Sequence, residues 1–425
     1  MNGLFGILWG PLSDRFGRKR ILCMALFFFV FISIVCTFAP NIVVLLVFRA
    51  LQGAAVSATL VVGQGIIADI YPPETRGWYT GIFFVPFLIG PVIGPLIGGA
   101  LSEKFGWRST FVLLSAFSFL VALCIQILLP ETHQYIAMQR FEQQHPNKRI
   151  QEHENQSKPH FQQPWLALRF LVDISVMPYI GIAATTFIGL FTSFTLFSDY
   201  LAKEPYKKDE TIIGALFVPA GTMMLVGSLL GGWLSDKAND YFTLKCPEGR
   251  LVPGTILSLF SPLGLMIYGW SFHFRIPLAV CIIGQMMLSF GQSIFLPGVY
   301  AYITAKKQKD AAAASAANSL LSFVGASVSV TIAVPVKNAL GDGAFFSILS
   351  GINIVMILTA AMIILRCIKA GQCIYVANEE MEQVNRSSVF KISYKHVEVE
   401  NDTKSEQRSR TYTVATESAV EEPQL

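Results

Sequence analysis

The chain has 425 residues, of which 53% are hydrophobic and only 14% are charged. Soluble domains contain about 25% charged residues, so the composition indicates a membrane protein and excludes an ordinary soluble domain. The net charge of +4 is a sum over two opposite membrane faces and gives no indication of a nucleic-acid partner. The seven cysteines lack the spacing of a disulfide framework, a zinc site or a redox pair, so we expect no metal or bound cofactor.

Apolar stretches recur along the whole chain. The first ten residues are mainly apolar but only about half a span long, and we interpret them as the second half of a membrane helix. Ten further stretches are long enough to cross a bilayer as helices of roughly 20 residues. These predicted spans cover residues 21–38, 42–68, 78–101, 110–129, 175–198, 211–234, 252–271, 276–299, 311–334 and 343–366.

The spans predict an all-α membrane protein with two helical bundles. We expect the first bundle at residues 1–132 and the second at residues 173–366. A polar linker, residues 133–172, joins the bundles, and residues 367–425 have the Glu-, Ser-, Thr- and Lys-rich composition of a disordered tail.

Positive charge predicts the orientation of the spans. Cytoplasmic loops of membrane proteins carry an excess of Lys and Arg, and one set of loops in this chain is richer in both. These loops are at residues 15–20, 76, 237–250 and 306–309. We therefore expect them to be cytoplasmic, together with the central linker and the tail.

The loop that follows the first half-span is short and strongly basic. Gly17 permits the positive φ that a tight turn needs. Asp14 is the one acid of the loop, and at a helix end it could face the positive N-terminus of the span that starts near Asp310. Asp14 would then latch the two bundles together; the alternative is a loop that only fixes topology. The residues that we assign to the latch are Asp14, Arg15, Gly17, Arg18 and Arg76.

The two bundles share a repeated motif. Gly10-Pro-Leu-Ser-Asp14 follows the first half-span, and Gly232-Trp-Leu-Ser-Asp236 occupies the equivalent helix end in the second bundle. An internal repeat of this kind is typical of secondary transporters built from two related halves.

The predicted span at residues 78–101 contains a ladder of glycines. Gly90, Gly94 and Gly98 lie at i, i+4 and i+8, and therefore on one helix face. Because this face carries no side chains, we expect another helix to approach it closely. Pro91 and Pro95 each remove a backbone donor and are expected to bend the helix.

Few polar residues are predicted inside the spans. Arg49 must hold a full charge there, which usually marks an ion or proton path; the alternative is a structural arginine bonded to backbone carbonyls. Phe187 and Phe191 form an aromatic stripe, which is more often packing than a substrate site, although aromatic faces would suit cationic amphiphiles. The residues that could line a substrate cavity are Gln52, Phe187, Phe191, Gln285, Gln292 and Asn318.

These motifs resemble those of a known family. The loop from Gly10 to Arg20 resembles the signature loop of the major facilitator superfamily, Gly-x-Leu-x-Asp-Arg-x-Gly-Arg-Lys/Arg, with every position filled. The ladder resembles the fifth-helix motif of the family's proton antiporters, and the flanks of the sixth span are similar to those of fungal twelve-span drug:proton antiporters of the quinidine-resistance type. The positions that match the antiporter motif are Gly81, Gly90, Gly94, Pro95, Gly98 and Gly99.

The resemblance implies a major facilitator fold of two six-helix bundles, in which the first helix and half of the second are missing because the chain is truncated. It implies export of small amphiphilic or cationic drugs and xenobiotics across the plasma membrane, by a monomer that uses a proton gradient in place of a cofactor. Arg49 is implied in proton coupling, with Asp69 or an acid of the missing helix as its partner. The alternatives are an exporter of a physiological amine, weak acid or dityrosine-like metabolite, and an inactive fragment. The sequence contains no nucleophile–base pair or phosphate loop that would suggest an enzyme.

Overall fold

Helices make up all the regular secondary structure of the residues that the computed structural model describes. These residues are 1–133, 136, 166–173, 175–202, 206–207, 210–242, 247–306 and 311–370. The helices of the first bundle are α1 (Asn2–Phe16), α2 (Arg18–Thr37), α3 (Ile42–Ile70), α4 (Arg76–Phe105) and α5 (Arg108–Leu128). Those that follow are α8 (Leu166–Phe170), α9 (Met177–Ala202), α10 (Glu210–Leu216), α11 (Val218–Phe242), the 3-10 helix η1 (Pro247–Leu251), α12 (Val252–Leu257), α13 (Phe260–His273), α14 (Leu278–Lys306), α15 (Ala311–Leu340) and α16 (Asp342–Ala370).

The all-α fold class is confirmed, and each predicted span coincides with helix. Nine helical stretches of the described residues are long and apolar enough to cross a membrane. α4 covers the predicted span at 78–101 but is not among these nine. Four of its side chains, at residues 91, 92, 95 and 96, lie outside the described part of the chain.

Two predicted spans are divided into shorter helices near a proline. The span predicted at 211–234 comprises α10 and α11, and Pro219 is the second residue of α11. The span predicted at 252–271 comprises α12 and α13, with η1 directly before it, and Pro262 is the third residue of α13. Proline lacks an N–H group and clashes with the preceding turn, so it is tolerated most easily in the first turn of a helix.

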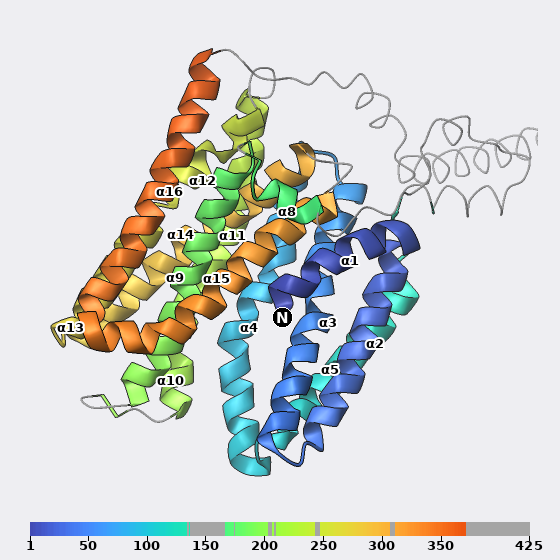
Figure 1. The fold of residues 1–425 in the computed structure, drawn as a ribbon, viewed down its shortest axis with the longest axis vertical. Helices are drawn as coiled ribbons and strands as arrows, with labels where there is room; N and C mark the ends of the chain where they lie inside the picture. Colours follow the sequence, from blue (N-terminus) through green and yellow to red (C-terminus); the bar gives the residue numbers. More distant parts are fainter. Residues whose placement is uncertain are drawn as a thin grey trace, which may run out of the picture. The chain divides into compact units, whose positions relative to one another are not determined.

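Several helices of the first bundle pack on the second (Figure 1). α2 lies against α3 and α5, whereas α4 packs mainly against α11, and α1 lies beside both α3 and α15. Residues 1–133 and 159–375 accordingly form one compact unit. Residues 134–158 and 376–425 make up a second unit, which lies almost entirely outside the described residues.

Glycines allow α4 to cross α11 at close range. A Cβ atom added to Gly81 would lie 2.8 Å from the carbonyl oxygen of Ser228, and one added to Gly232 would lie 2.5 Å from the carbonyl oxygen of Gly77. The Ser228 hydroxyl donates a hydrogen bond to the Gly81 carbonyl at 2.9 Å. The two backbones therefore touch directly, as at small-xxx-small contacts between membrane helices.

The prediction that a neighbouring helix packs on the glycine ladder is wrong for the described residues. At four of its glycines no atom lies within 4 Å of an added Cβ atom: Gly90, Gly94, Gly98 and Gly99. The reason is helical geometry, because residues 81 and 90 are nine apart and at about 100° per residue lie on opposite helix faces. The predicted bend at Pro91 and Pro95 involves side chains outside the described residues.

We expect Gly81→Ala to lower the free energy of unfolding by about 1–3 kcal/mol, the usual effect of forcing extra atoms into a tight contact. Gly94→Ala on the same helix is the matched control. It should leave stability unchanged or slightly raised, because the added methyl group meets no neighbour and alanine is the better helix former. Thermal unfolding of the purified chain in detergent measures both variants, and equal losses in the two would contradict the packing described for α4.

Candidate functional site

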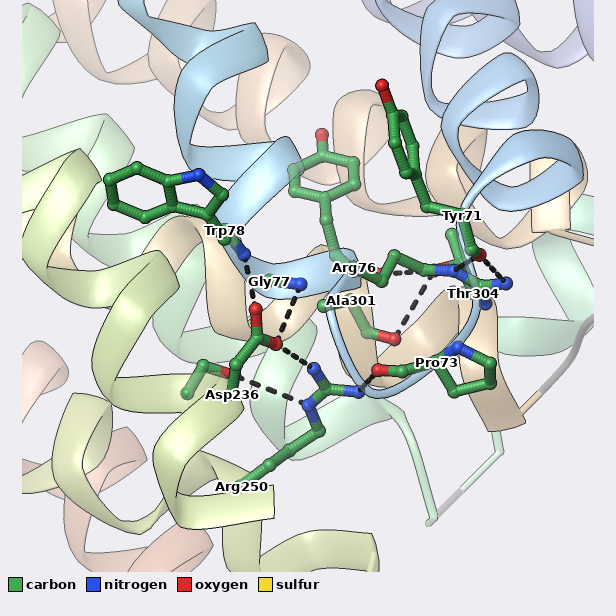
Figure 2. Close-up of polar contacts among 11 residues, drawn as sticks. Tyr71, Pro73, Arg76, Gly77, Trp78, Asp236, Arg250, Ala301 and Thr304 are labelled. Atoms are coloured by element: carbon green, nitrogen blue, oxygen red, sulfur yellow. Dashed lines mark hydrogen bonds and ion pairs between the residues drawn. The ribbon is translucent and has the colours of Figure 1, made fainter. Parts of the chain in front are cut away.

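A carboxylate from the second bundle caps the N-terminus of α4. Asp236 of α11 accepts hydrogen bonds from the backbone N–H of Gly77 at 2.9 Å and of Trp78 at 2.7 Å (Figure 2). Thr75, the residue at the N-cap position, makes no side-chain capping bond. The first N–H groups of a helix have no partner within it and form the positive end of the helix dipole. Asp236 of the second bundle therefore supplies the N-terminus of α4, in the first bundle, with both a hydrogen-bond acceptor and a negative charge.

Arg250 ties the same carboxylate to the turn between α3 and α4. Its guanidinium is buried and donates to Asp236 Oδ1 at 2.9 Å, to Ser235 Oγ at 3.3 Å and to the carbonyl of Pro73 at 3.2 Å (Figure 2). Removing one partner of a buried ion pair leaves the other charge uncompensated. Asp236 and Arg250 thus act as one unit that contacts the first bundle twice.

Arg76, assigned to the latch from the sequence, supports the start of α4 from inside. Only 1% of it is exposed. It donates to the backbone carbonyl of Tyr71 at 2.9 Å (Figure 2) and to that of Ala68 at 3.0 Å, so it fixes the turn that leads into the capped helix end.

A second charged cluster lies where α1, α2 and α3 meet, centred on Arg18. This guanidinium forms ion pairs with Asp14 and, through Nε at 2.9 Å, with Asp69, and it donates to Ser13 Oγ at 2.7 Å. Arg15 is exposed and lies over the ring of the next residue, 5.3 Å from its centroid. All of these contacts stay within the first bundle.

Gly17 lets the first loop wrap around Glu131. Its φ of 98° confirms the predicted positive φ. A side chain at Gly17 would collide with the Glu131 carboxylate, which accepts a hydrogen bond from the backbone N–H of Arg18 at 2.8 Å. Burial and then the Arg18 cation lower the pKa of the nearby His133. His133 is therefore neutral near pH 7 and adds no further cation to the cluster.

Asp14 makes its described ion pair within the first bundle. α1 does lie beside the start of α15, since a Cβ atom added to Gly10 would be 3.4 Å from the backbone of Ala312. Among the described residues, the buried Asp14 Oδ2 has no hydrogen-bond partner. Asp310 lies outside the described residues, so a latch between Asp14 and that helix start stays a prediction. The capping bonds between the bundles that the structure describes come from Asp236, the equivalent acid of the repeat.

Arg49 lies on α3, within the predicted span at 42–68, and is exposed rather than covered by neighbouring helices. Its guanidinium donates to Gln52 at 3.0 Å and lies 4.9 Å from the ring centroid of Phe111 in α5. Gln52 is buried and in turn donates to Ser33 of α2 at 2.7 Å. Asp69 follows Arg49 by twenty residues on the same helix, which is about 30 Å at 1.5 Å per residue, so the two do not form a pair.

Phe187 and Phe191 pack within the second bundle. Their ring centroids are 4.4 Å apart, and the Phe187 ring lies 5.0 Å from that of Phe323 in α15. Because Phe187 is buried in this contact between α9 and α15, its position favours packing over direct substrate contact.

The polar residues predicted for the substrate cavity are buried on α14 and α15. The Gln285 side-chain amide donates to Ser193 Oγ of α9 at 3.1 Å, and Gln292 Oε1 accepts from Ser293 Oγ at 3.1 Å. Asn318 is 1% exposed, and its Oδ1 has no hydrogen-bond partner among the residues that the structure describes.

Sequence analysis missed several charged residues of these clusters. Glu248 of η1 accepts hydrogen bonds from Lys306 at 2.8 Å and from the Tyr302 hydroxyl at 2.9 Å. The repeated motif could have indicated Asp236, because Asp14 was expected to face the start of a helix and Asp236 is the equivalent acid of the second copy. No sequence pattern marks Arg250. The described residues include no group of three His, Cys, Asp or Glu side chains that could hold a metal ion.

Residues 1–330 match the sequence model of the Major Facilitator Superfamily. The chain belongs to this superfamily. It is therefore a multi-pass integral membrane protein that transports small molecules, and not an enzyme.

Similar proteins include fungal transporters. The chain is 23% identical to the MFS antiporter QDR3 of Candida albicans, over 87% of this chain and 70% of QDR3. It is 26% identical to the efflux pump radE of Floropilus chiversii, over 82% of this chain and 68% of radE. The human organic anion transporter MFSD10 shares the fold, with a TM-score of 0.59 and 17% identity over 84% of this chain and 80% of that one.

We expect Asp236→Asn to destabilise the junction by about 2–4 kcal/mol, because the buried Arg250 loses its counter-charge and the α4 start loses an ionised acceptor. The backbone N–H groups of Gly77 and Trp78 should then exchange with deuterium at least about tenfold faster. Hydrogen–deuterium exchange of a peptide covering residues 74–82 measures this change.

Asp240→Asn is the control for that substitution, because Asp240 lies one turn further along α11 and is exposed. It removes the same charge and should leave exchange at residues 74–82 unchanged. Unaltered exchange in Asp236→Asn, or equal acceleration in both variants, would contradict the capping role of Asp236.

Proposed function

We propose that this transporter exports small amphiphilic compounds, among them cationic drugs and other xenobiotics, in exchange for protons. The observation that carries the proposal is the junction at Asp236 and Arg250. The bundles meet there through the two hydrogen bonds that Asp236 accepts from the start of α4 and the one that Arg250 donates to Pro73. Beside them the backbones of α4 and α11 touch at glycines, without interlocking side chains. Such a contact can break and re-form when the bundles rock against each other, as alternating access requires.

The direction and the coupling are supported by the names of the relatives. QDR3 is an antiporter and radE is an efflux pump, and the chain is similar to both over most of its length. The glycine and proline positions from Gly81 to Gly99 fit the same antiporter motif.

We further propose that the chain works as a monomer in the plasma membrane, with the loops at Gly17 and Arg76 facing the cytoplasm. The excess of Lys and Arg in these loops supports this orientation, which also places the linker and the tail in the cytoplasm. In this orientation the Asp236 contact closes the cytoplasmic side, and opening it would admit a compound from the cell interior.

For proton coupling we propose two candidates that act at different places. Arg49 brings a permanent charge to the side of α3 that faces α2 and α5. Asp69 brings a carboxylate that can exchange a proton, next to Arg18 at the end of the same helix. No cofactor is required, because the proton gradient supplies the free energy.

The direct test is transport by the purified chain in liposomes. An imposed pH gradient should accelerate movement of a labelled amphiphilic cation against the proton flow, and a trapped pH dye should report matching proton movement. A panel that adds amines, weak acids and dityrosine distinguishes a drug exporter from a carrier of a physiological metabolite. Transport that ignores the gradient would overturn proton antiport, and a chain that moves none of the compounds would overturn export.

We expect Arg49→Ala to reduce the acceleration of export by the gradient about tenfold or more, while substrate binding remains. Arg49 favours the ionised form of any carboxylate that approaches it, so its loss raises that carboxylate's pKa and prevents release of the proton. Arg49→Lys keeps the charge without the planar fork of donors and should restore coupling only in part.

Arg108→Ala is the matched control, because Arg108 also lies over an aromatic ring, that of Trp107 at 4.5 Å, at the same end of the bundle, but donates to the Ala39 carbonyl rather than to Gln52. It should leave gradient-driven export unchanged. If export by Arg49→Ala still responds fully to the gradient and export by Asp69→Asn does not, the proton coupling belongs to Asp69 alone.

A further inference from the structure

Gln64 of α3 is a buried amide with unused hydrogen-bonding groups. Only 1% of the residue is exposed, and neither its side-chain oxygen nor its side-chain nitrogen has a hydrogen-bond partner in the described part of the chain. Burying an amide without a partner is costly, and the cost is avoided by any apolar side chain of similar size. The amide therefore calls for an explanation other than the stability of the fold.

The neighbours of α3 show which way Gln64 faces. Val61 contacts α1 at Gly6, where an added Cβ atom would lie 3.4 Å from the Val61 side chain. Gly63 contacts α4, since a Cβ atom there would lie 2.6 Å from the ring of Phe83. At about 100° per residue, position 64 falls between these two directions. α1 also packs on α15, α4 also packs on α14, and α3 meets both α14 and α15, so we infer that the side of α3 between α1 and α4 is directed at the second bundle.

The second bundle presents polar groups at the same level. Tyr300 of α14 has its hydroxyl 3.4 Å from Ser319 Oγ of α15, and the adjacent Asn318 is buried with an unpartnered Oδ1. Three of these residues lie six or seven positions from a helix end: Gln64 from the end of α3, Tyr300 from the end of α14, and Asn318 from the start of α15. Six or seven residues correspond to about 10 Å along a helix. The polar groups of the two bundles therefore lie at the same depth, close to the junction at Asp236 and Arg250.

An aromatic wall adjoins these polar groups. The ring of Phe84 on α4 is 5.1 Å from that of Tyr300, and the ring of Phe83 is 5.5 Å from that of Phe84. Phe84 and Tyr300 come from different bundles and are both buried. A flat apolar group could stack against them while its polar edge reaches the amides.

The surrounding helices offer no charge to a ligand at this level. Residues 50–68, 77–102, 278–305 and 311–336 contain no Asp, Glu, Lys or Arg. The nearest acid on α3, Asp69, is paired with Arg18. A charged group would be desolvated here without a counter-charge, whereas an uncharged group with a donor and an acceptor could bond the Gln64 amide and Asn318 Oδ1.

We propose that Gln64 and Asn318 hydrogen-bond an uncharged polar group of the exported compound, such as an amide or a conjugated carbonyl with an amino group, while Phe84 and Tyr300 stack on its flat face. This inference rests on the proposed export function and narrows its substrate class to compounds with an uncharged, flat polar portion. Any cationic part of a substrate lies outside this level.

Binding of 7-amino-4-methylcoumarin to the purified full chain in lipid nanodiscs tests the proposal. This probe is flat, neutral at pH 7, and carries a donor and an acceptor. Gln64→Leu should raise its Kd about five- to tenfold, the effect of losing one hydrogen bond, and Asn318→Leu should do the same. The Kd of rhodamine 6G, a cation, should change less than about twofold in Gln64→Leu, as expected for a ligand without that bond.

Asn353→Leu is the matched control, because Asn353 is also a fully buried amide but lies on α16, where its Nδ2 donates to Ser261 Oγ of α13 at 3.1 Å. Asn353→Leu should lower the melting temperature and leave aminocoumarin binding intact. Gln64→Leu should show the opposite pattern, with a melting temperature unchanged or raised and weaker binding.

A Gln64→Leu variant that binds the aminocoumarin as tightly as the wild type would overturn the proposal, as would one that loses stability with unchanged binding. A wild-type chain that binds rhodamine 6G but not the aminocoumarin would overturn the ligand class while leaving export in place. The predicted binding pattern in a chain that moves no compound in liposomes would support the site and overturn the proposed export.

Discussion

The carboxylate of Asp236 at the start of α4 is the contact on which the junction of the two bundles depends. It lies near the positive end of a helix dipole, accepts two N–H groups that the helix itself cannot satisfy, and neutralises the buried Arg250. The glycines nearby follow from this contact, since a Cβ atom on Gly77 would lie 2.5 Å from Asp236 Oδ1. The sequence requirements at residues 77, 81, 232 and 236 are therefore one requirement, close approach of two helices with a charge between them.

The two copies of the Gly-x-Leu-Ser-Asp repeat use their acids differently, and the residue four positions on explains why. Asp14 is followed by Arg18 at i+4, and the two form a local ion pair. Asp236 is followed at i+4 by Asp240, which is exposed and of the same charge. Asp236 therefore finds its partners elsewhere, at the start of α4 and in Arg250. Among the described residues, Asp14 is thus paired inside its own bundle, whereas Asp236 binds across the boundary between the bundles.

Much of the fold could be predicted because it depends on local sequence. The spans follow from the length of apolar stretches, and the positive φ of Gly17 follows from a tight turn between two helices. The direction in which a helix face points could not be predicted, because it depends on how whole helices rotate against one another. The glycine ladder was expected to be packed, yet Gly90 and Gly94 meet no neighbour among the described residues. Arg250 and Gln64 were missed for the same reason, since their roles exist only once distant helices are brought together.

The central claim is that the Asp236 carboxylate holds the ends of α4 and α11 together and that this bond must break for transport. Pulsed electron paramagnetic resonance between spin labels at Thr75 and Lys237, both exposed and on either side of the contact, tests it most directly in a background without other reactive cysteines. With Asp236 present, the distance distribution should be dominated by one short distance, and Asp236→Asn should shift it toward a longer one. A distribution that is unchanged by the loss of the carboxylate would contradict the account.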